Sequence, residues 1–169
     1  MTVAVLFDLE DTLVKTPWEN QQHVLEFRCK TREKLTKLGI PSATLEGIER
    51  ATLMRNKAAE YVESNFSRAS IRQFNEEMER FLSQYEMDSA DKATLFPDTI
   101  PTLEKLTELG MKLGLVTNTS NKAADRILQT NGLNSYFSVV VTRESVKKLK
   151  PDPEGILLAA KKLAAKRFF

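Results

Sequence analysis

The sequence predicts an α/β fold in which a parallel sheet carries helices on both faces and a small α-helical domain is inserted after the first strand. An uninterrupted apolar run, Val3 to Phe7, begins the chain and is typical of a strand buried on both faces of a parallel sheet. From about residue 16 to residue 87, apolar residues recur with a helical period. From Leu95 onward, short apolar runs alternate with helical segments, which indicates βαβ units.

We therefore expect one core domain from residues 1–15 and 95–169, and a helical domain, the cap, from residues 16–94. The cap contains three amphipathic stripes: Val24, Phe27, Thr31, Leu35 and Leu38; Leu45, Ile48, Thr52, Arg55, Ala59 and Val62; and Ile71, Phe74, Met78, Phe81, Leu82 and Tyr85. Gly39 and Pro41 end the first helix. Ser70 and Gln73 form a predicted capping box that begins the third.

The core elements follow the first strand in regular alternation. We expect a helix that carries Leu103, Leu106 and Leu109 and ends at Gly110, a strand over 112–117, a helix over 121–130, a strand over 137–142 and a helix from residue 154 to about 165. Arg167-Phe168-Phe169 resembles the beginning of one more strand, which the chain does not complete.

Composition narrows the classes of function. Lys and Arg total 25 against 23 acidic residues, so a net charge of +2 gives no electrostatic reason to expect a nucleic-acid or membrane partner. No apolar run approaches the length of a membrane span. The single cysteine and the absence of a secretory signal predict a cytoplasmic protein. We expect it to be a monomer or a homodimer. His23 and Cys29 cannot assemble a zinc site, and Trp18 is expected to pack.

Polar residues follow two of the predicted strands. Asp8 and Glu10 come at the end of the first strand, and Thr117 and Asn118 at the end of the strand over 112–117. The carboxyl ends of parallel strands share one edge of a sheet, where ligands bind. Two carboxylates there suit a metal ion, or a nucleophile with a proton donor. The simpler alternative is a polar turn after the first strand and a helix N-cap cluster after the second.

Three segments resemble motifs of the haloacid dehalogenase superfamily. Phe-Asp-Leu-Glu-Asp-Thr-Leu at residues 7–13 is similar to its first motif, Leu-Val-Thr-Asn-Thr at 115–119 to its second, and Leu-Lys-Pro-Asp-Pro at 149–153 to its third. The order of the motifs and the helical insertion agree with members that resemble phosphoglycolate phosphatase. This resemblance implies a Rossmann-like core with a helical cap.

The resemblance also implies roles for single residues. Asp8 matches the nucleophile that forms an aspartyl-phosphate and binds Mg²⁺, and Glu10 matches the general acid and base, with its main-chain carbonyl as a second metal ligand. Thr117, Asn118 and Lys150 match the residues that hold the phosphate. The Lys150 ammonium would offset the charge of Asp8 and of the bound phosphate.

The sequence departs from the family pattern at three places. Glu10 stands where an aspartate is usual. Asp11 stands where a glycine is usual, so the backbone at this position must have a conformation that an aspartate tolerates. The fourth motif, an acidic loop that supplies another Mg²⁺ ligand, is absent, so we expect a core truncated at its C-terminal end. The missing strand would lie beside the first, which leaves one side of Val3 to Phe7 without a partner.

These observations predict a Mg²⁺-dependent phosphatase that acts on a small phosphorylated metabolite. The alternative is a degenerate or truncated, non-catalytic relative that binds phosphate compounds or serves as an interaction module. A dehalogenase is less favoured, because the acid at Glu10 suits proton delivery to an alcohol leaving group. Substrate identity does not follow from the sequence, since the helical stripes report only packing.

Overall fold

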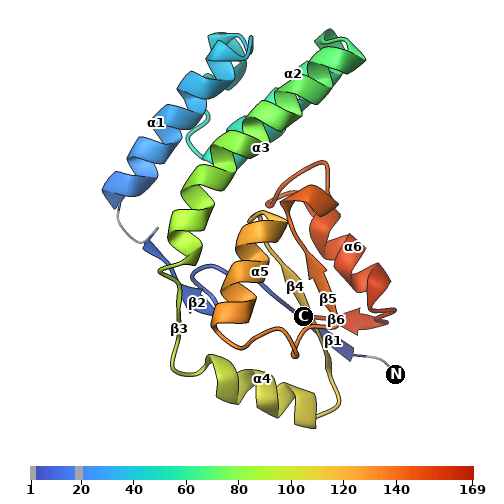
Figure 1. The fold of residues 1–169 in the computed structure, drawn as a ribbon. Helices are drawn as coiled ribbons and strands as arrows, with labels where there is room; N and C mark the ends of the chain where they lie inside the picture. The colour runs from blue at the N-terminus through green and yellow to red at the C-terminus, as the bar shows by residue number, and fades with distance from the viewer. Residues whose placement is uncertain (1–2, 18–20) are drawn as a thin grey trace. The chain divides into compact units, whose positions relative to one another are not determined.

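The computed structural model describes residues 3–17 and 21–169, which form two compact units (Figure 1). The core unit contains residues 3–17 and 86–169, and the helical unit contains residues 21–85. The expected domain boundaries after residue 15 and before residue 95 stay a prediction. Trp18 lies outside the described residues.

The core unit is built on a four-stranded parallel sheet. Its strands are β1 (Val3–Phe7), β4 (Lys112–Val116), β5 (Val139–Val141) and β6 (Arg167–Phe168), in the order β5-β4-β1-β6. β1 pairs with β4 from Ala4 opposite Lys112 to Phe7 opposite Leu115. The prediction of an α/β fold with a parallel sheet is confirmed, and β1 occupies the interior position that its apolar run indicated.

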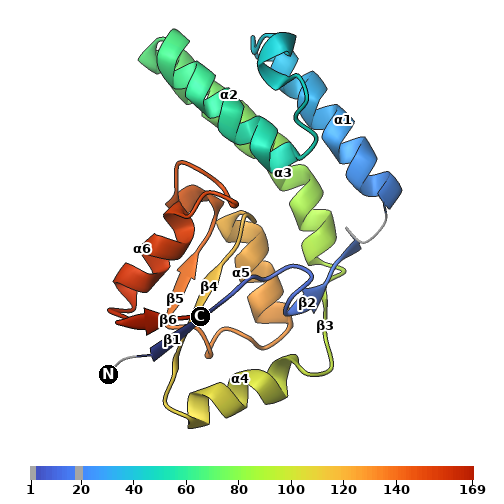
Figure 2. The same cartoon turned by 180° about the vertical axis from the view of Figure 1, so that it is seen from behind.

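Helices cover both faces of this sheet (Figure 1 and Figure 2). Leu113 and Leu115 pack in one apolar cluster with residues of α4 (Thr99–Glu108) and α5 (Asn121–Thr130). Val116 packs on the opposite face with Ala159 of α6 (Glu154–Lys162). The alternation follows from the two-residue period of a strand, which sends neighbouring side chains to opposite faces.

A second, two-stranded sheet consists of β2 (Val14–Lys15) and β3 (Thr94–Leu95), which pair in antiparallel orientation. The chain therefore leaves the core unit and returns to it through neighbouring strands. This pair was not predicted, because two residues are too few for a strand period to be recognised.

The helical unit contains α1 (Gln21–Lys37), a 3₁₀ helix η2 (Ser42–Leu45), α2 (Ala51–Asn65) and most of α3 (Arg68–Ala90). The helices meet in one cluster whose buried members are Leu35, Ile40, Leu45, Met54, Ala58, Val62, Phe74, Met78 and Leu82. The buried face of α2 is formed by Met54, Ala58 and Val62, so the predicted stripe through Thr52, Arg55 and Ala59 is wrong except at Val62. Two further details of the prediction are wrong. Leu45 and Ile48 precede α2, which begins only at Ala51.

The start of α3 is the second correction. The helix begins at Arg68, and the hydroxyl of Ser67 accepts a hydrogen bond from the backbone N–H of Ser70 at 3.2 Å. Ser67 therefore acts as the N-cap, three residues before the predicted position. Either serine satisfies the capping pattern, so the sequence alone did not decide between them.

The end of the chain also corrects an expectation. β6 pairs in parallel with β1, Val3 opposite Arg167 and Ala4 opposite Phe168, and the Leu6 N–H donates to the Phe169 carbonyl at 2.9 Å. The first half of β1 therefore has a partner on the side that was expected to lack one. The prediction that these last residues begin a strand is confirmed.

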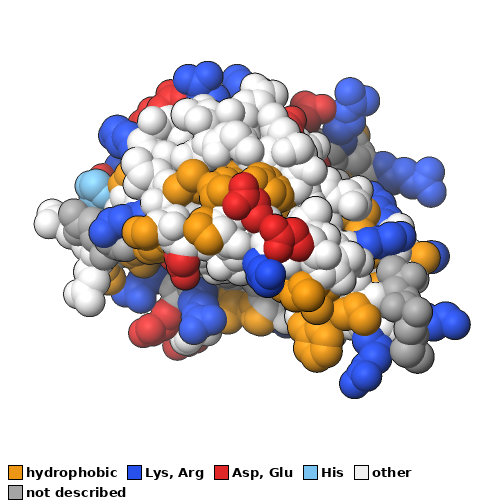
Figure 3. All heavy atoms as spheres, turned by 90° about the horizontal axis from the view of Figure 1, so that it is seen from below, with side chains coloured by type: hydrophobic (Ala, Val, Ile, Leu, Met, Phe, Trp, Pro, Cys, Tyr) orange, Lys and Arg blue, Asp and Glu red, His pale blue; other side chains and the backbone are white. Residues whose placement is uncertain are grey.

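Large apolar side chains are exposed at several points of the described surface. Figure 3 shows one face of the molecule, on which apolar side chains lie among charged ones of both signs. The exposed set includes Leu109, Leu157, Phe168 and Phe169. No helix among the described residues is both long enough and apolar enough to span a membrane.

Candidate active site

The end of β1 places two carboxylates on either side of a buried leucine. Asp8 is exposed, Leu9 is fully buried, and the Leu9 N–H donates to Oδ1 of Asp8 at 2.8 Å. Asp11 has φ of 57°, so the chain turns here through the left-handed conformation that the usual glycine would adopt. An aspartate tolerates this conformation better than most residues.

Lys150 lies directly against Asp8. Its Nζ is 2.6 Å from Oδ1 of Asp8 and donates to the carbonyl of Val116, the last residue of β4, at 2.8 Å. Both side chains are partly exposed, so a ligand can reach them. Two residues separated by most of the chain thus form an ion pair at the carboxyl ends of β1 and β4.

Asn118 holds the backbone of Lys150 through both ends of its side-chain amide. Its Oδ1 accepts from the Lys150 N–H at 2.9 Å, and its Nδ2 donates to the Lys150 carbonyl at 3.2 Å. The peptide bond between Lys150 and Pro151 is cis. Asn118 therefore contacts the chain of Lys150 and fixes the loop from which the Lys150 side chain extends.

Glu10 belongs to a chain of buried side-chain hydrogen bonds. The Thr119 hydroxyl donates to Oε2 of Glu10 at 2.7 Å, and the Thr117 hydroxyl donates to the Thr119 hydroxyl at 2.9 Å. Thr117 and Thr119 are 4% and 2% exposed, so these bonds are shielded from water. The structure thus links Glu10 to the end of β4 through Thr119.

The surroundings of Glu10 favour its protonated form. The pKa of Glu10 is raised to about 7, chiefly by burial; the hydrogen bond from Thr119 lowers it, and the negative charges of Glu86, Asp8 and Asp11 contribute to the rise. Its second oxygen, Oε1, is buried and has no hydrogen-bond partner among the described residues. A carboxyl group that changes charge near neutral pH suits a general acid and base.

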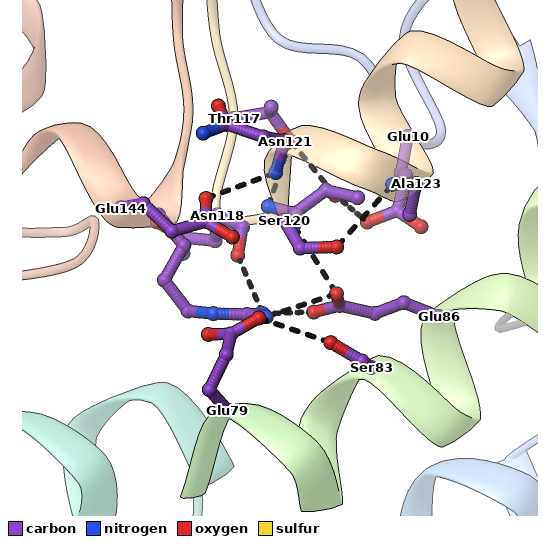
Figure 4. A network of polar contacts seen from close by, with 12 residues as sticks. Glu10, Glu79, Ser83, Glu86, Thr117, Asn118, Ser120, Asn121, Ala123 and Glu144 are labelled. Atoms are coloured by element: carbon purple, nitrogen blue, oxygen red, sulfur yellow. Dashed lines mark hydrogen bonds and ion pairs between the residues drawn. The ribbon is translucent and has the colours of Figure 1, made fainter. Parts of the chain in front are cut away.

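A buried ion pair supports the loop that follows β4 (Figure 4). Arg143 is 3% exposed and pairs with Glu86, which lies near the end of α3. The same Glu86 accepts from the Ser120 N–H at 3.1 Å, and the Arg143 N–H donates to the Thr119 carbonyl at 3.1 Å. The guanidinium also donates to the Asn118 carbonyl at 3.4 Å, so three successive residues of the loop are held by their backbone.

Sequence reasoning had assigned no role to Thr119, Glu86 or Arg143. Thr119 and Ser120 together matched an N-cap cluster, but only Ser120 caps α5, through its hydroxyl to the Ala123 N–H at 3.3 Å. An arginine in a loop after a buried strand gives no signal that it will be buried. Glu86 follows Leu82 by four residues and so continues the apolar face of α3, but a glutamate near a helix end is normally solvated and was given no role.

The oxygen donors at this edge suit a magnesium ion. Mg²⁺ prefers oxygen ligands, and it is commonly held by one or two carboxylates together with substrate phosphate oxygens and water. Asp8 presents an accessible carboxylate, and Glu10 follows two residues later. Within residues 3–17 and 21–169, no three His, Cys, Asp or Glu side chains are grouped to hold a metal ion by themselves.

Comparison with known protein families agrees with this geometry. The sequence model of the haloacid dehalogenase-like hydrolases matches residues 5–167. The chain belongs to this family. The three segments that resemble its motifs, residues 7–13, 115–119 and 149–153, lie at the ends of β1 and β4 and before α6.

Curated relatives are phosphatases. Over 169 residues the chain is 31% identical to pyrophosphatase PpaX of Bacillus velezensis, an alignment that covers 95% of this chain and 68% of the relative. It is 27% identical to N-acetylmuramic acid 6-phosphate phosphatase of Pseudomonas putida, again over 95% of this chain and 68% of the relative. A phosphoglycolate phosphatase of Salmonella choleraesuis is 36% identical over 51% of this chain and 34% of its own length.

Solved structures show the same fold. A haloacid dehalogenase-like hydrolase of Bacteroides fragilis superposes with a TM-score of 0.57 at 24% identity, over 97% of this chain and 73% of the other. A β-phosphoglucomutase of Clostridium difficile gives a TM-score of 0.57 at 21% identity, over 98% and 72%. These similarities show that the chain shares the fold of these two structures over nearly its whole length.

Proposed function

We propose that this chain is a Mg²⁺-dependent phosphatase that hydrolyses a small phosphorylated metabolite through an aspartyl-phosphate on Asp8. The observation that carries the proposal is the contact between Lys150 and Asp8 at 2.6 Å, beside a second acid, Glu10, whose surroundings favour the protonated form. Two neighbouring acids with different surroundings are the usual arrangement for a nucleophile and a proton donor. The relatives that act on phosphorylated compounds support the same class of substrate.

In the first step, a carboxylate oxygen of Asp8 attacks phosphorus while the ester bond to the leaving oxygen breaks. The proton of Glu10 passes to that oxygen, so an alcohol leaves and the phosphoryl group is bound to Asp8. In the second step, water attacks the phosphorus of the aspartyl-phosphate and gives a proton to Glu10. Inorganic phosphate leaves, and both carboxyl groups return to their starting states.

Lys150 and the loop after β4 would bind the phosphoryl oxygens. The Lys150 ammonium lies beside Asp8 and can compensate the charge of the nucleophile and of the phosphate. Thr117 begins the loop after β4, and its hydroxyl is directed at Thr119 in this structure. Asn118 acts mainly by holding Lys150 in place, through its two bonds to the Lys150 backbone.

The carboxylate of Asp8 and the main-chain carbonyl of Glu10 would hold the magnesium ion. When bound, the ion supplies positive charge to the phosphoryl oxygens and to the nucleophile. Substrate oxygens and water are the usual additional ligands of Mg²⁺ and would complete its coordination.

Hydrolysis of p-nitrophenyl phosphate with and without Mg²⁺ tests the proposal. Wild-type protein should release phosphate only with the metal, and Asp8→Asn should reduce kcat by at least about 10³-fold, since it removes the nucleophile. Asp98→Asn is a matched control, because Asp98 is exposed at the start of α4 and contacts none of the site residues. Equal rates for wild type and Asp8→Asn would refute covalent catalysis by Asp8.

The same experiment addresses the non-catalytic alternative. If wild type is inactive but binds vanadate or phosphate with an affinity that Lys150→Met weakens, a binding module is supported instead. Transfer of ³²P to wild type from labelled acetyl phosphate, and none to Asp8→Asn, would support the enzyme independently of turnover.

A further inference from the structure

The two oxygens of the Glu10 carboxyl group have different surroundings. Oε2 accepts a hydrogen bond from the Thr119 hydroxyl at 2.7 Å. Oε1 is buried and has no partner among the described residues. A buried polar atom without a partner is unfavourable and rare in folded proteins, so such an atom at a site edge points to a ligand atom that completes it.

We propose, on the basis of the phosphatase function above, that Thr119 is a positioning residue that holds Oε2 of Glu10 and leaves Oε1 to exchange the proton with the leaving group. The hydrogen bond fixes the plane of the carboxyl group, because one of its two oxygens is tied to the loop after β4. Thr119 itself does not touch the substrate.

Thr119 is well suited to this role because it is itself held on several sides. Its N–H donates to the Thr117 hydroxyl at 3.2 Å, its own hydroxyl accepts from that of Thr117 at 2.9 Å, and its carbonyl accepts from the Arg143 N–H at 3.1 Å. It is 2% exposed, and a β-branched side chain has few rotamers. The hydroxyl therefore offers a fixed anchor point.

The replacement of the usual aspartate by Glu10 gives a reason for such an anchor. A glutamate has one more rotatable bond than an aspartate, so its carboxyl group can take more positions. Displacement of a catalytic group by about 1 Å can reduce the rate by on the order of 10²-fold. A fixed hydrogen bond to one oxygen removes that freedom before the substrate binds.

The proposal predicts a dependence on the leaving group. When the ester bond breaks, an alkoxide needs the proton from Oε1, whereas p-nitrophenolate is stable without it. A poorly placed Glu10 should therefore slow the hydrolysis of an alkyl phosphate more than that of p-nitrophenyl phosphate. A merely structural role for Thr119 would affect both substrates equally.

The test compares Thr119→Val, which removes the hydroxyl, with Thr119→Ser, which keeps it. We expect Thr119→Val to reduce kcat/KM for glycerol 2-phosphate by about 10–100-fold and for p-nitrophenyl phosphate by less than about 3-fold. Thr119→Ser should restore both values to within about 3-fold of wild type. Thr31→Val is the matched control, because Thr31 is also fully buried and its hydroxyl donates to the Phe27 carbonyl in α1.

Equal losses on the two esters, or no loss on either, would overturn the positioning role while the phosphatase function stands. If wild type hydrolyses neither ester, the proposed function fails, and crystal structures then decide the inference by themselves. An unchanged Glu10 carboxyl orientation in Thr119→Val would overturn it. A rotated carboxyl group in Thr119→Val, restored in Thr119→Ser, would support it.

Discussion

Replacing Glu10 by glutamine should stabilise the fold at alkaline pH relative to wild type. The substitution keeps the shape of the side chain and an oxygen that can accept from Thr119, but removes the ionisable group. Its effect therefore separates the charge of Glu10 from its packing. The wild-type protein at high pH must keep an ionised carboxylate in a buried place, and the variant need not.

The magnitude follows from the raised pKa. The pKa of Glu10 rises from 4.5 to about 7 on folding, and each tenfold change in proton affinity is worth about 1.4 kcal/mol. Between these two values the unfolded chain loses its proton before the folded chain does. The free energy of unfolding of wild type should therefore fall by about 3 kcal/mol as the pH rises from about 4.5 to about 7, and then level off.

Urea unfolding of both proteins in a chelating buffer, from about pH 4.5 to about pH 8, measures this difference. The other titrating groups are common to both proteins, so their contributions cancel in the difference between variant and wild type. Any penalty from the amide N–H₂ of glutamine is constant with pH. Glu104→Gln is a matched control, since Glu104 is exposed on α4 and should give no such dependence.

Parallel stability curves for wild type and Glu10→Gln would refute the reasoning. That result would mean that Glu10 is ionised in the folded protein as readily as in the unfolded chain. The protonated acid assigned to the first step of the reaction would then lose its physical basis.

Three further predictions concern the site and its support. Lys150→Met should reduce kcat/KM for p-nitrophenyl phosphate by about 10²–10³-fold, whereas Lys161→Met, on the exposed face of α6, should leave it unchanged. Arg143→Met should lower the free energy of unfolding by about 3–5 kcal/mol in urea, because Glu86 stays buried, and adding Glu86→Leu should recover most of the loss. Gly114→Ala should lower the urea midpoint by the equivalent of about 1 kcal/mol, since its Cβ would lie 2.8 Å from Leu6 Cδ2 and 3.0 Å from Leu163 Cδ1, and these side chains must turn to make room; an unchanged midpoint would contradict the packing of β4.

The order of elements in the core could be predicted because the relevant signals are local. Apolar runs such as Val3–Phe7 identify buried strands, and parallel strands deliver the residues after them to one edge. This geometry groups Asp8 and Glu10 with Thr117 and Asn118. Lys150 lies nine residues beyond the end of β5, so only the motif resemblance indicated it, and the structure shows its contact with Asp8.

Other features could not be predicted because they depend on side-chain reach across the fold. The partner of Glu10 is Thr119, 109 residues later, and nothing in the local sequence distinguishes it from its neighbours. The burial of Arg143 results from the position of Glu86 near the end of a long helix. Such contacts are set by tertiary packing, which residue spacing does not encode.

Because β2 and β3 lie side by side, the main chain departs from the core unit and comes back at adjacent points. The segment between β2 and β3 therefore has its two ends close together, like a closed loop inserted into the core unit. Doubling the length of a flexible loop costs only about 0.6 kcal/mol of closure free energy. A scaffold of this kind tolerates shorter, longer or differently folded inserts, while Asp8 and Lys150 keep their positions. The helical insert and the residues at the sheet edge can then change independently along one polypeptide.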